Sequence, residues 1–217
     1  MEELSTVPEK QEKNLQRWLF NPFYYLAGGK ALVIGVGFII ATGIIAFLSN
    51  SRFDGVLDIH SAALSKAPIW VYVSDGMISW IIMGILLLIG GKIISPSRVR
   101  ALDVFGTQAL ARFPCLITAV FLLLPGYQRI VQKIAQAGTG FPTLLETSPA
   151  DVVMFSLTLL AGILMIIWMV ALMYRAYAVS CNVSGGKAAG VFITALILGE
   201  VVSKIILIST STLYMLK

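Results

Sequence analysis

The chain has 217 residues, of which 58% are hydrophobic and only 12% are charged. Soluble domains carry roughly 25% charged residues, so this composition excludes a water-soluble domain and indicates a membrane protein in contact with the lipid bilayer. The formal net charge of +5 does not indicate a nucleic-acid partner, because the basic residues do not cluster with exposed aromatic residues.

Residues 1–30 form a polar segment of mixed charge, which we expect to be cytoplasmic. It ends in an aromatic stretch, "QRWLFNPFYYLAGGK", whose amphipathic rings favour the headgroup level of a membrane. A residue before proline avoids the α region, so a short interfacial helix should end at Asn21 and Pro22.

Residues 31–213 are expected to form an all-α membrane domain, a bundle of five transmembrane helices with short interfacial helices. Several runs approach or exceed the roughly 18 apolar residues that a bilayer-crossing helix needs. The expected spans are residues 31–48, 70–90, 109–124, 152–173 and 188–208. The third is the weakest, because it is fully apolar only from Phe113 to Leu124 and must extend back across Arg112 and Pro114.

Two connecting segments have the spacing of helices that lie in the membrane interface. Before the third span, Leu102, Phe105, Ala109 and Phe113 recur at helical intervals while charged residues face elsewhere, which is typical of a helix in the inner interface. The segment "YQRIVQKIAQA", residues 127–137, has a similar pattern over three turns.

Lysine and arginine are distributed unequally between the two sides of the expected topology. Ten fall on the side of the N-terminus (Lys10, Lys13, Arg17, Lys30, Lys92, Arg98, Arg100, Arg112, Arg175 and Lys187) and five on the other (Arg52, Lys66, Arg129, Lys133 and Lys217). Since cytoplasmic loops carry the excess of positive charge, we expect an inner-membrane protein with its N-terminus in the cytoplasm and its C-terminus outside.

Residue types that carry catalysis are scarce. The chain has one histidine, His60, near Asp58 in the first outer loop, and a lone histidine is more often a surface residue than a ligand or base. No metalloprotease, serine-hydrolase or paired-cysteine zinc pattern is present. We therefore expect no enzyme activity, no catalytic residues, no cofactor and no metal.

Small residues lie at intervals that favour close packing of helices. Gly35 lies in the first span, and Ala195, Gly199 and Ser203 form a ladder of four-residue steps along the fifth. Small residues let helix backbones approach closely in lipid, where packing drives association. The ladder predicts a helix–helix interface, either inside the bundle or between copies of the chain.

Three ionisable residues, Asp75, Glu200 and Lys204, lie inside the expected spans. A central Asp, Lys or Arg costs roughly 2.5–3.5 kcal/mol on insertion scales, so the depth of each matters. At 1.5 Å per residue, Glu200 and Lys204 lie about 18 and 24 Å from the inner end of the fifth span, and Asp75 lies about 8 Å below the outer end of the second. All three are expected in the outer half of the bilayer.

Three interpretations of this candidate polar cluster stay open. Glu200 and Lys204, four residues apart in the favourable order, could neutralise each other while Asp75 caps the second helix near water. The three side chains could instead pack together, with both acids sharing Lys204. They could also serve transport or a proton relay.

The stretch "IIWMVALMYRAYAVSCNVSGGKAAGVFITALILGEVV" resembles one in the Yip (Ypt/Rab-interacting protein) domain family of integral membrane proteins. It joins an apolar span containing Trp168 and Ala171 to a short loop of small and hydroxyl residues ahead of Lys187 and Ala188. The Asn-Pro pair and the five expected spans also fit, and the resemblance covers roughly residues 21–213. It implies a five-span protein that can oligomerise; eukaryotic members bind prenylated small GTPases and shape transport vesicles.

The long polar N-terminal region and the Asp-Leu-Tyr-Gly-Pro motif of those members are missing from this sequence, so it looks more like the prokaryotic branch, and no family residue carries over. We expect a non-enzymatic membrane scaffold or interaction protein in membrane organisation or trafficking, with a second copy or another membrane protein as partner. The alternative is a small transporter or channel that uses the polar cluster. A water-accessible cavity reaching Glu200 would favour transport, and a packed bundle with an apolar exterior groove would favour the scaffold.

Overall fold

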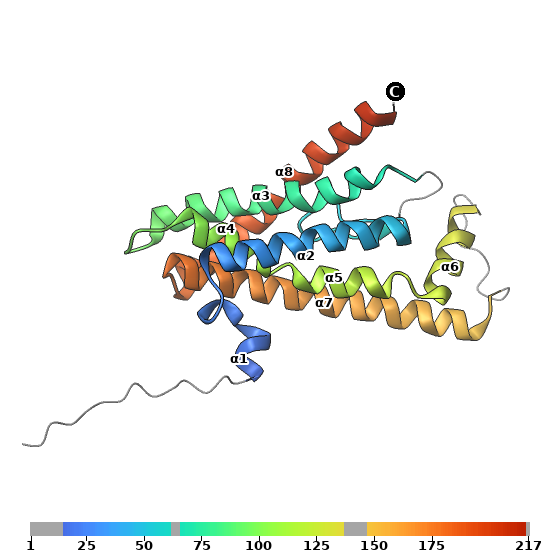
Figure 1. Ribbon diagram of the computed structural model, residues 1–217, viewed down its shortest axis with the longest axis horizontal. Coiled ribbons are helices and arrows are strands. Elements are labelled where there is room, and N and C mark those ends of the chain that lie inside the picture. Colours follow the sequence, from blue (N-terminus) through green and yellow to red (C-terminus); the bar gives the residue numbers. More distant parts are fainter. Residues whose placement is uncertain (1–14, 62–65, 137–146, 216–217) are drawn as a thin grey trace, which may run out of the picture.

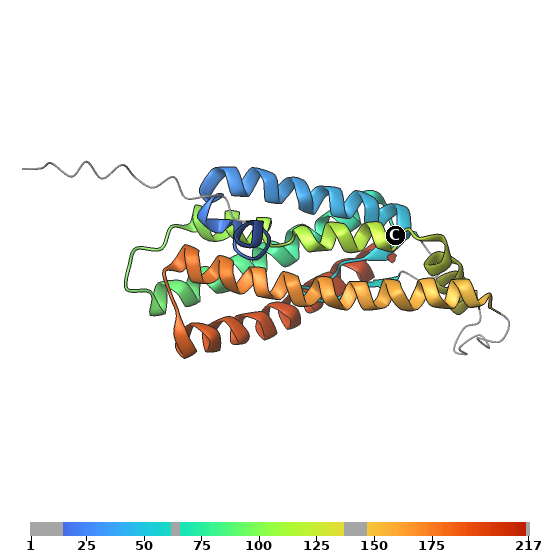
Figure 2. The ribbon, with the colours of Figure 1, turned by 90° about the horizontal axis from the view of Figure 1, so that it is seen from below.

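The computed structural model describes residues 15–61, 66–136 and 147–215. In chain order the elements are α1 (Leu15–Phe20), η1 (Pro22–Tyr24), α2 (Gly28–Ser49), β1 (Ser51–Arg52), β2 (His60–Ser61), α3 (Ile69–Ile94), α4 (Ala101–Leu110), α5 (Phe113–Phe121), α6 (Pro125–Gln136), α7 (Pro149–Cys181) and α8 (Gly185–Met215). The long helices follow the long axis of the molecule, α6 turns across one end, and α8 crosses the others at an angle (Figure 1, Figure 2). The predicted all-α bundle is confirmed.

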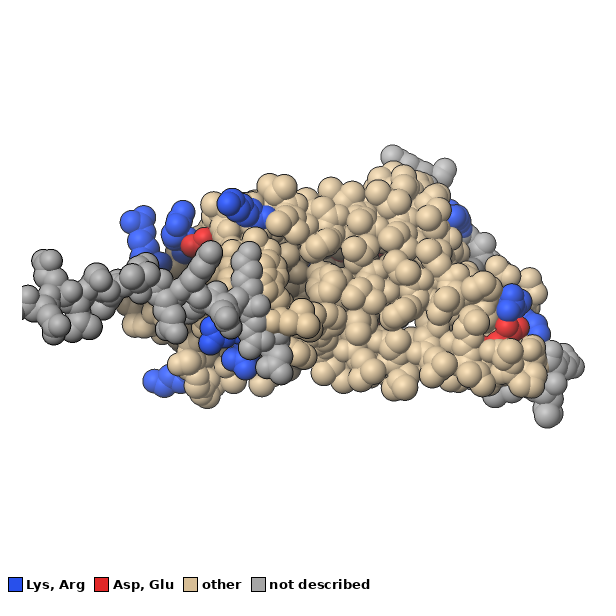
Figure 3. Space-filling model, turned by 60° about the horizontal axis from the view of Figure 1, so that its bottom comes forward, with Lys and Arg blue, Asp and Glu red and all other residues tan. Residues whose placement is uncertain are grey.

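Five helical segments are long and apolar enough to cross a membrane, and they make this a multi-pass membrane protein. They are Gly28–Ser49, Ile69–Ile94, Ala101–Phe121, Pro149–Cys181 and Gly185–Ile208. Four of them contain the spans expected from the sequence and extend beyond them at one or both ends. Charged side chains gather at the two ends of the molecule, and a broad band without them lies between (Figure 3). This is the surface that a bilayer requires.

Two asparagines end long helices by the same device. Asn50 follows α2 with a φ of 50° and Asn182 follows α7 with a φ of 51°. Asparagine tolerates this left-handed conformation better than most residues, and it lets the amide of each residue donate back into the last turn. Asn50 N–H thus donates to Ala46 O, and Asn182 N–H to Ala178 O. Both helices stop at their asparagine.

The third span differs from the sequence-based expectation. We expected residues 109–124 to cross the membrane after an interfacial helix, but α4 and α5 together form one segment, Ala101–Phe121. Pro114 lies in the first turn of α5 and has no N–H to donate to Leu110 O, so the segment breaks at residues 111–112. The expectation of a helix lying in the inner interface is wrong, because most of α4 is buried within the bundle.

The third segment is the most enclosed of the five. In its most apolar window 67% of residues are buried within the protein, against 33% or less in the other four. Polar residues such as Thr107 and Gln108 therefore face protein and not lipid. This burial explains why the segment is the least apolar span in the sequence, since hydropathy reports contact with lipid only for helices that touch it.

Small residues and two hydrogen bonds fix α4 between its neighbours. A Cβ on Gly35 would lie 2.4 Å from the backbone of Ala109, so α2 and α4 touch backbone to backbone. The Trp80 indole of α3 donates to Phe105 O at 3.0 Å, and the Gln108 amide donates to Met173 O of α7 at 2.9 Å. The α4 helix thus joins three of the long helices.

Candidate functional site

The chain between α2 and α3 folds into the bundle and organises the charged residues there. We call residues 51–60 the inserted segment. Its ends pair as a short antiparallel ribbon, Arg52 opposite His60, while Phe53 and Val56 are buried. Non-helical backbone is tolerated at membrane depth where protein surrounds it, and here α3 and α8 provide much of that surrounding. The two strands are the small departure from the expected all-α fold.

Asp75 of α3 is held by Arg52 of the inserted segment. The Arg52 guanidinium donates from Nε to Oδ2 at 2.7 Å and from Nη2 to Oδ1 at 2.9 Å, which is the bidentate geometry of a strong pair. The side chains are 12% and 1% exposed. Burial alone would lower the pKa of Arg52, but the hydrogen bonds and charge of Asp75 outweigh it and the pKa is raised.

Lys204 of α8 binds two carboxylates of the inserted segment. Its ammonium donates to Asp54 at 3.1 Å and also to Asp58. His60 lies beside the same carboxylates, with Nδ1 3.2 Å from Asp54. Burial alone would raise the pKa of Asp54, but the hydrogen bond and charge of His60 and then those of Lys204 lower it to about 2. Asp54 is therefore an anion across the physiological pH range.

Glu200 of α8 holds the backbone of the inserted segment. Its carboxylate accepts a hydrogen bond from the Leu57 amide at 2.8 Å. The close approach depends on Gly55, because a Cβ there would lie 2.5 Å from Glu200 Oε1. Glu200 thus fixes where the inserted segment meets α8.

The structure gives each of the three predicted cluster residues a different partner. Asp75 pairs with Arg52, Lys204 with Asp54 and Asp58, and Glu200 with a backbone amide. Two of the interpretations left open by the sequence are therefore wrong for the described residues: both acids sharing Lys204, and Glu200 pairing with Lys204. The physical reason is that the inserted segment brings its own charges to α3 and α8. His60 is exposed, as expected from the sequence, and lies at the edge of this group beside Asp54.

Three residues of the inserted segment have the composition of a metal site. The ligand atoms of Asp54, Asp58 and His60 lie within 4.8 Å of one another. The ammonium of Lys204 already binds both carboxylates, so a cation would have to displace it. The arrangement works chemically as an internal ion-pair network.

The predicted small-residue ladder lies inside the bundle. Ala195 and Ser203 are buried, and a Cβ on Gly199 would lie 3.2 Å from Met83 Sδ of α3 and 3.4 Å from Val56. The ladder is thus the surface on which α3 and the inserted segment pack. Of the two interfaces that the sequence allowed, the structure shows the one inside the bundle. Gly35 likewise lies in an internal contact, against α4.

Arg112 is a buried charge inside the bundle, whereas the sequence analysis counted it among the cations on the cytoplasmic side. It lies at the break between α4 and α5, is 5% exposed, and has no hydrogen-bond partner for its Nη2 within the described part of the chain. It lines a small cavity of about 20 Å³ together with Thr42 and Tyr72, which is enough room for one water molecule. The sequence did contain one indication of this burial, because the third expected span had to extend back across Arg112.

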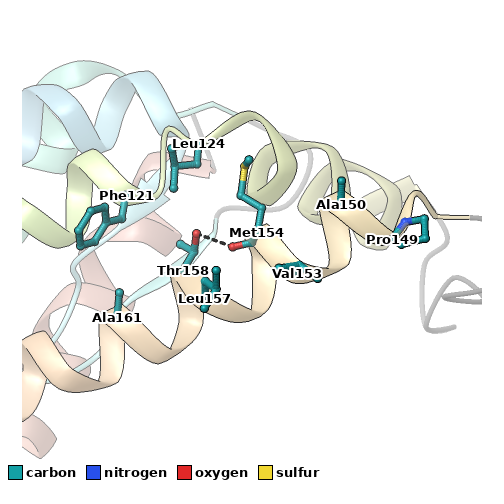
Figure 4. Close-up of a pocket in the computed structure, with 9 residues that line it drawn as sticks. All are labelled: Phe121, Leu124, Pro149, Ala150, Val153, Met154, Leu157, Thr158 and Ala161. Carbon is teal, nitrogen blue, oxygen red and sulfur yellow. Dashed lines mark hydrogen bonds between the residues drawn. The ribbon is translucent and has the colours of Figure 1, made fainter.

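An apolar groove lies on the outside of the bundle at the end where α6 is. It has a volume of about 590 Å³ and is lined by Phe121 and Leu124 and by α7 from Pro149 to Ala161 (Figure 4). The hydroxyl of Thr158 points along its own helix and donates to Met154 O at 2.9 Å. The groove wall therefore presents hydrocarbon to whatever lies against it.

Comparisons with family models, with curated proteins and with solved structures give no match to this chain.

Proposed function

We propose that this multi-pass membrane protein is a non-enzymatic scaffold or interaction protein of the Yip type, acting in membrane organisation or trafficking. One observation carries the proposal: the three ionisable residues of the predicted polar cluster, Asp75, Glu200 and Lys204, are held by the inserted segment. Asp75 is 1% exposed and bound in bidentate fashion, and Lys204 binds two carboxylates. A transport site needs groups that exchange partners with a passing ion, whereas these pairs brace the fold.

The lipid-facing surface offers room for protein partners. Only 11% of the residues in the most apolar window of α7 are buried within the protein, and 28% of those in the window of α8, so both helices have a broad exposed face. Residues such as Leu160, Leu164 and Ile197 are about half exposed or more. A second copy or another membrane protein would bind here, as the resemblance to the Yip family implies.

The charge distribution supports an orientation with the α1 end in the cytoplasm. The described residues at that end comprise seven cations (Arg17, Lys30, Lys92, Arg98, Arg100, Arg175 and Lys187) and one acid, Asp103. Those at the other end and in the adjoining parts of α3 and α8 comprise five cations (Arg52, Lys66, Arg129, Lys133 and Lys204) and five acids (Asp54, Asp58, Asp75, Asp151 and Glu200). The excess of positive charge marks the cytoplasmic side, and we propose the inner membrane as the location.

Photo-crosslinking in native membranes tests the scaffold proposal. A crosslinking amino acid is placed singly at Leu160, Leu164 or Ile197, which face lipid, and at buried Leu172 as control. We expect discrete protein adducts, to a second copy or to one other membrane protein, from the exposed positions and none from Leu172. Adducts to lipid alone at every exposed position would contradict the proposal.

The second candidate function, a small transporter or channel, is favoured by Arg112, because a buried guanidinium beside a cavity is a feature of ion pathways. Purified protein in liposomes is assayed for proton and chloride flux, with Glu200→Gln, Arg112→Gln and protein-free liposomes in parallel. Flux that both substitutions abolish would establish transport and overturn the scaffold proposal. Absence of flux in folded protein supports the scaffold.

A further inference from the structure

We propose that the apolar groove between α5 and α7 binds one acyl chain of a phospholipid, whose phosphate lies against the basic residues of α6. The inference goes beyond the proposed function and does not depend on it, since a scaffold and a transporter could both hold such a lipid. It rests on the length of the groove, its chemistry, its volume and the charge at its end.

The groove matches one leaflet in length and position. Along α7 it runs from Pro149 to Ala161, which is about 18 Å at the helical rise and close to half of a hydrocarbon core about 30 Å thick. The apolar part of α7 begins at Val152, directly after Asp151. Asp151 therefore marks the headgroup level, and the part of the groove from there to Ala161, about 15 Å long, descends into the hydrocarbon.

The walls select an apolar occupant. The lining comes from side chains such as Phe121, Val153 and Leu157, and Thr158, the polar one, donates its hydroxyl to its own helix. A peptide or sugar would leave its hydrogen-bonding groups without partners here, at a cost of several kcal/mol per group. A hydrocarbon chain has no hydrogen-bonding groups and therefore does not incur this cost.

The size of the groove favours a chain over a helix. Even when the open space at its mouth is counted, the groove offers no more than about 990 Å³. A helix with side chains is about 10–12 Å across, so an 18 Å stretch occupies roughly 1,400–2,000 Å³. A helix from a second copy could therefore lie only across the opening, while an extended acyl chain can lie inside.

The charges at the end of the groove suit a phosphate. Arg129 of α6 donates to Asp151 from Nε at 2.9 Å, and Lys133 lies one turn further along α6, within the electrostatic reach of Asp151. Among the described residues, Arg129, Lys133 and Asp151 sum to one formal positive charge at this end of the groove. A lipid phosphate placed there gains a charge-assisted contact.

The experiment uses the full chain in nanodiscs of equal parts phosphatidylcholine and phosphatidylglycerol, doped with a phospholipid that carries a diazirine in one acyl chain. After illumination, adducts are mapped by mass spectrometry. We expect them to concentrate at Val153 and Leu157, about tenfold over Leu160 and Leu164, which are equally exposed on the same helix but outside the groove. An even spread over the four positions, which ordinary annular lipid would give, overturns the proposal.

Two variants test the groove itself. Ala161→Phe fills it and should lower the adducts at Val153 and Leu157 about tenfold, whereas Ala171→Phe, the same change at an exposed position of α7 outside the groove, should leave them unchanged. Equal adducts in both variants would overturn the proposal. The mapping on the unaltered protein keeps the test decisive if Ala161→Phe fails to fold.

A further variant, tested with two probes, shows whether the bound acyl chain belongs to a phospholipid or to a lipid without a phosphate. Lys133→Gln should reduce adducts from the phospholipid probe and leave those from a diazirine fatty acid ester unchanged, because only the phospholipid carries a phosphate. Equal loss from both probes would refute the phosphate contact. Protein–protein adducts at Val153 and Leu157 would show a partner helix in place of the lipid.

Discussion

Neutralising Asp75 tests whether the inserted segment is held by a buried ion pair. Asp75→Asn keeps the shape of the side chain and removes the charge that binds Arg52 at 2.7 and 2.9 Å. Removing one partner of a buried pair typically costs 3–5 kcal/mol, because the other charge stays in a low-dielectric site. The gross attraction, about 4 kcal/mol for charges 4 Å apart at an effective dielectric of 20, is of the same size.

The assay is the titration of detergent-solubilised protein with sodium dodecyl sulfate, followed by circular dichroism. The expected loss of stability raises the equilibrium constant for unfolding by about two to four powers of ten. The matched control is Asp151→Asn, which breaks the Arg129–Asp151 pair. That pair is also bidentate, but Arg129 is 56% exposed, and exposed pairs contribute little to stability.

A second variant separates the cost of an isolated charge from the value of the pair. Arg52→Met combined with Asp75→Leu removes both charges, and it should recover most of the stability lost in Asp75→Asn, because no charge is then left buried. The reasoning is refuted if Asp75→Asn costs no more than Asp151→Asn, or if the double variant is as unstable as the single one.

Three further predictions concern packing, pH and the α1 contact. Gly35→Ala should destabilise the protein by about 1–3 kcal/mol in the same titration, because its Cβ meets α4 backbone at 2.4 Å, whereas Gly37→Ala, with nothing within 4 Å, should cost nothing; equal losses would contradict the backbone contact. The pKa of Asp54 is lowered to about 2 from 3.8, so its contribution is complete above pH 3.8 and is lost as the pH falls towards 2; stability measured against pH should show this loss, and Asp54→Asn should abolish it. Trp168→Phe removes the donor to Leu19 O, at 3.0 Å, and hydrogen exchange in α1 should become up to about tenfold faster; an unchanged rate would show that the ring contact alone holds α1.

Hydropathy predicted the spans that touch lipid and failed where a span touches protein. The apolar runs at residues 31–48, 70–90, 152–173 and 188–208 all lie within observed helices, since lipid contact demands apolar side chains over the whole span. The third span contains Gln108 and Arg112, which are buried against protein, so its sequence resembled an interfacial helix. Its position followed only from the packing of α4 against α2, α3 and α7.

For the candidate site, the sequence likewise predicted the depth of the charged residues but not their contacts within the protein. The sequence placed Asp75, Glu200 and Lys204 at membrane depth, because a helical rise converts residue number into depth. It could not supply their partners. Lys204 binds Asp54, 150 residues away, and Glu200 binds the Leu57 amide, 143 residues away, and no local pattern encodes contacts at such separation.

Composition and periodicity by themselves determined that this chain is an all-α membrane protein with five spans and small residues at helix contacts. These properties follow from the solvent, because a bilayer requires long apolar helices whose backbone bonds are satisfied within each helix. The tertiary structure decided which charges meet, since the contacts of the inserted segment with α3 and α8 join residues that are far apart in the sequence. It also decided that α4 is central and that a groove opens beside α7, because both depend on which faces of the helices find each other.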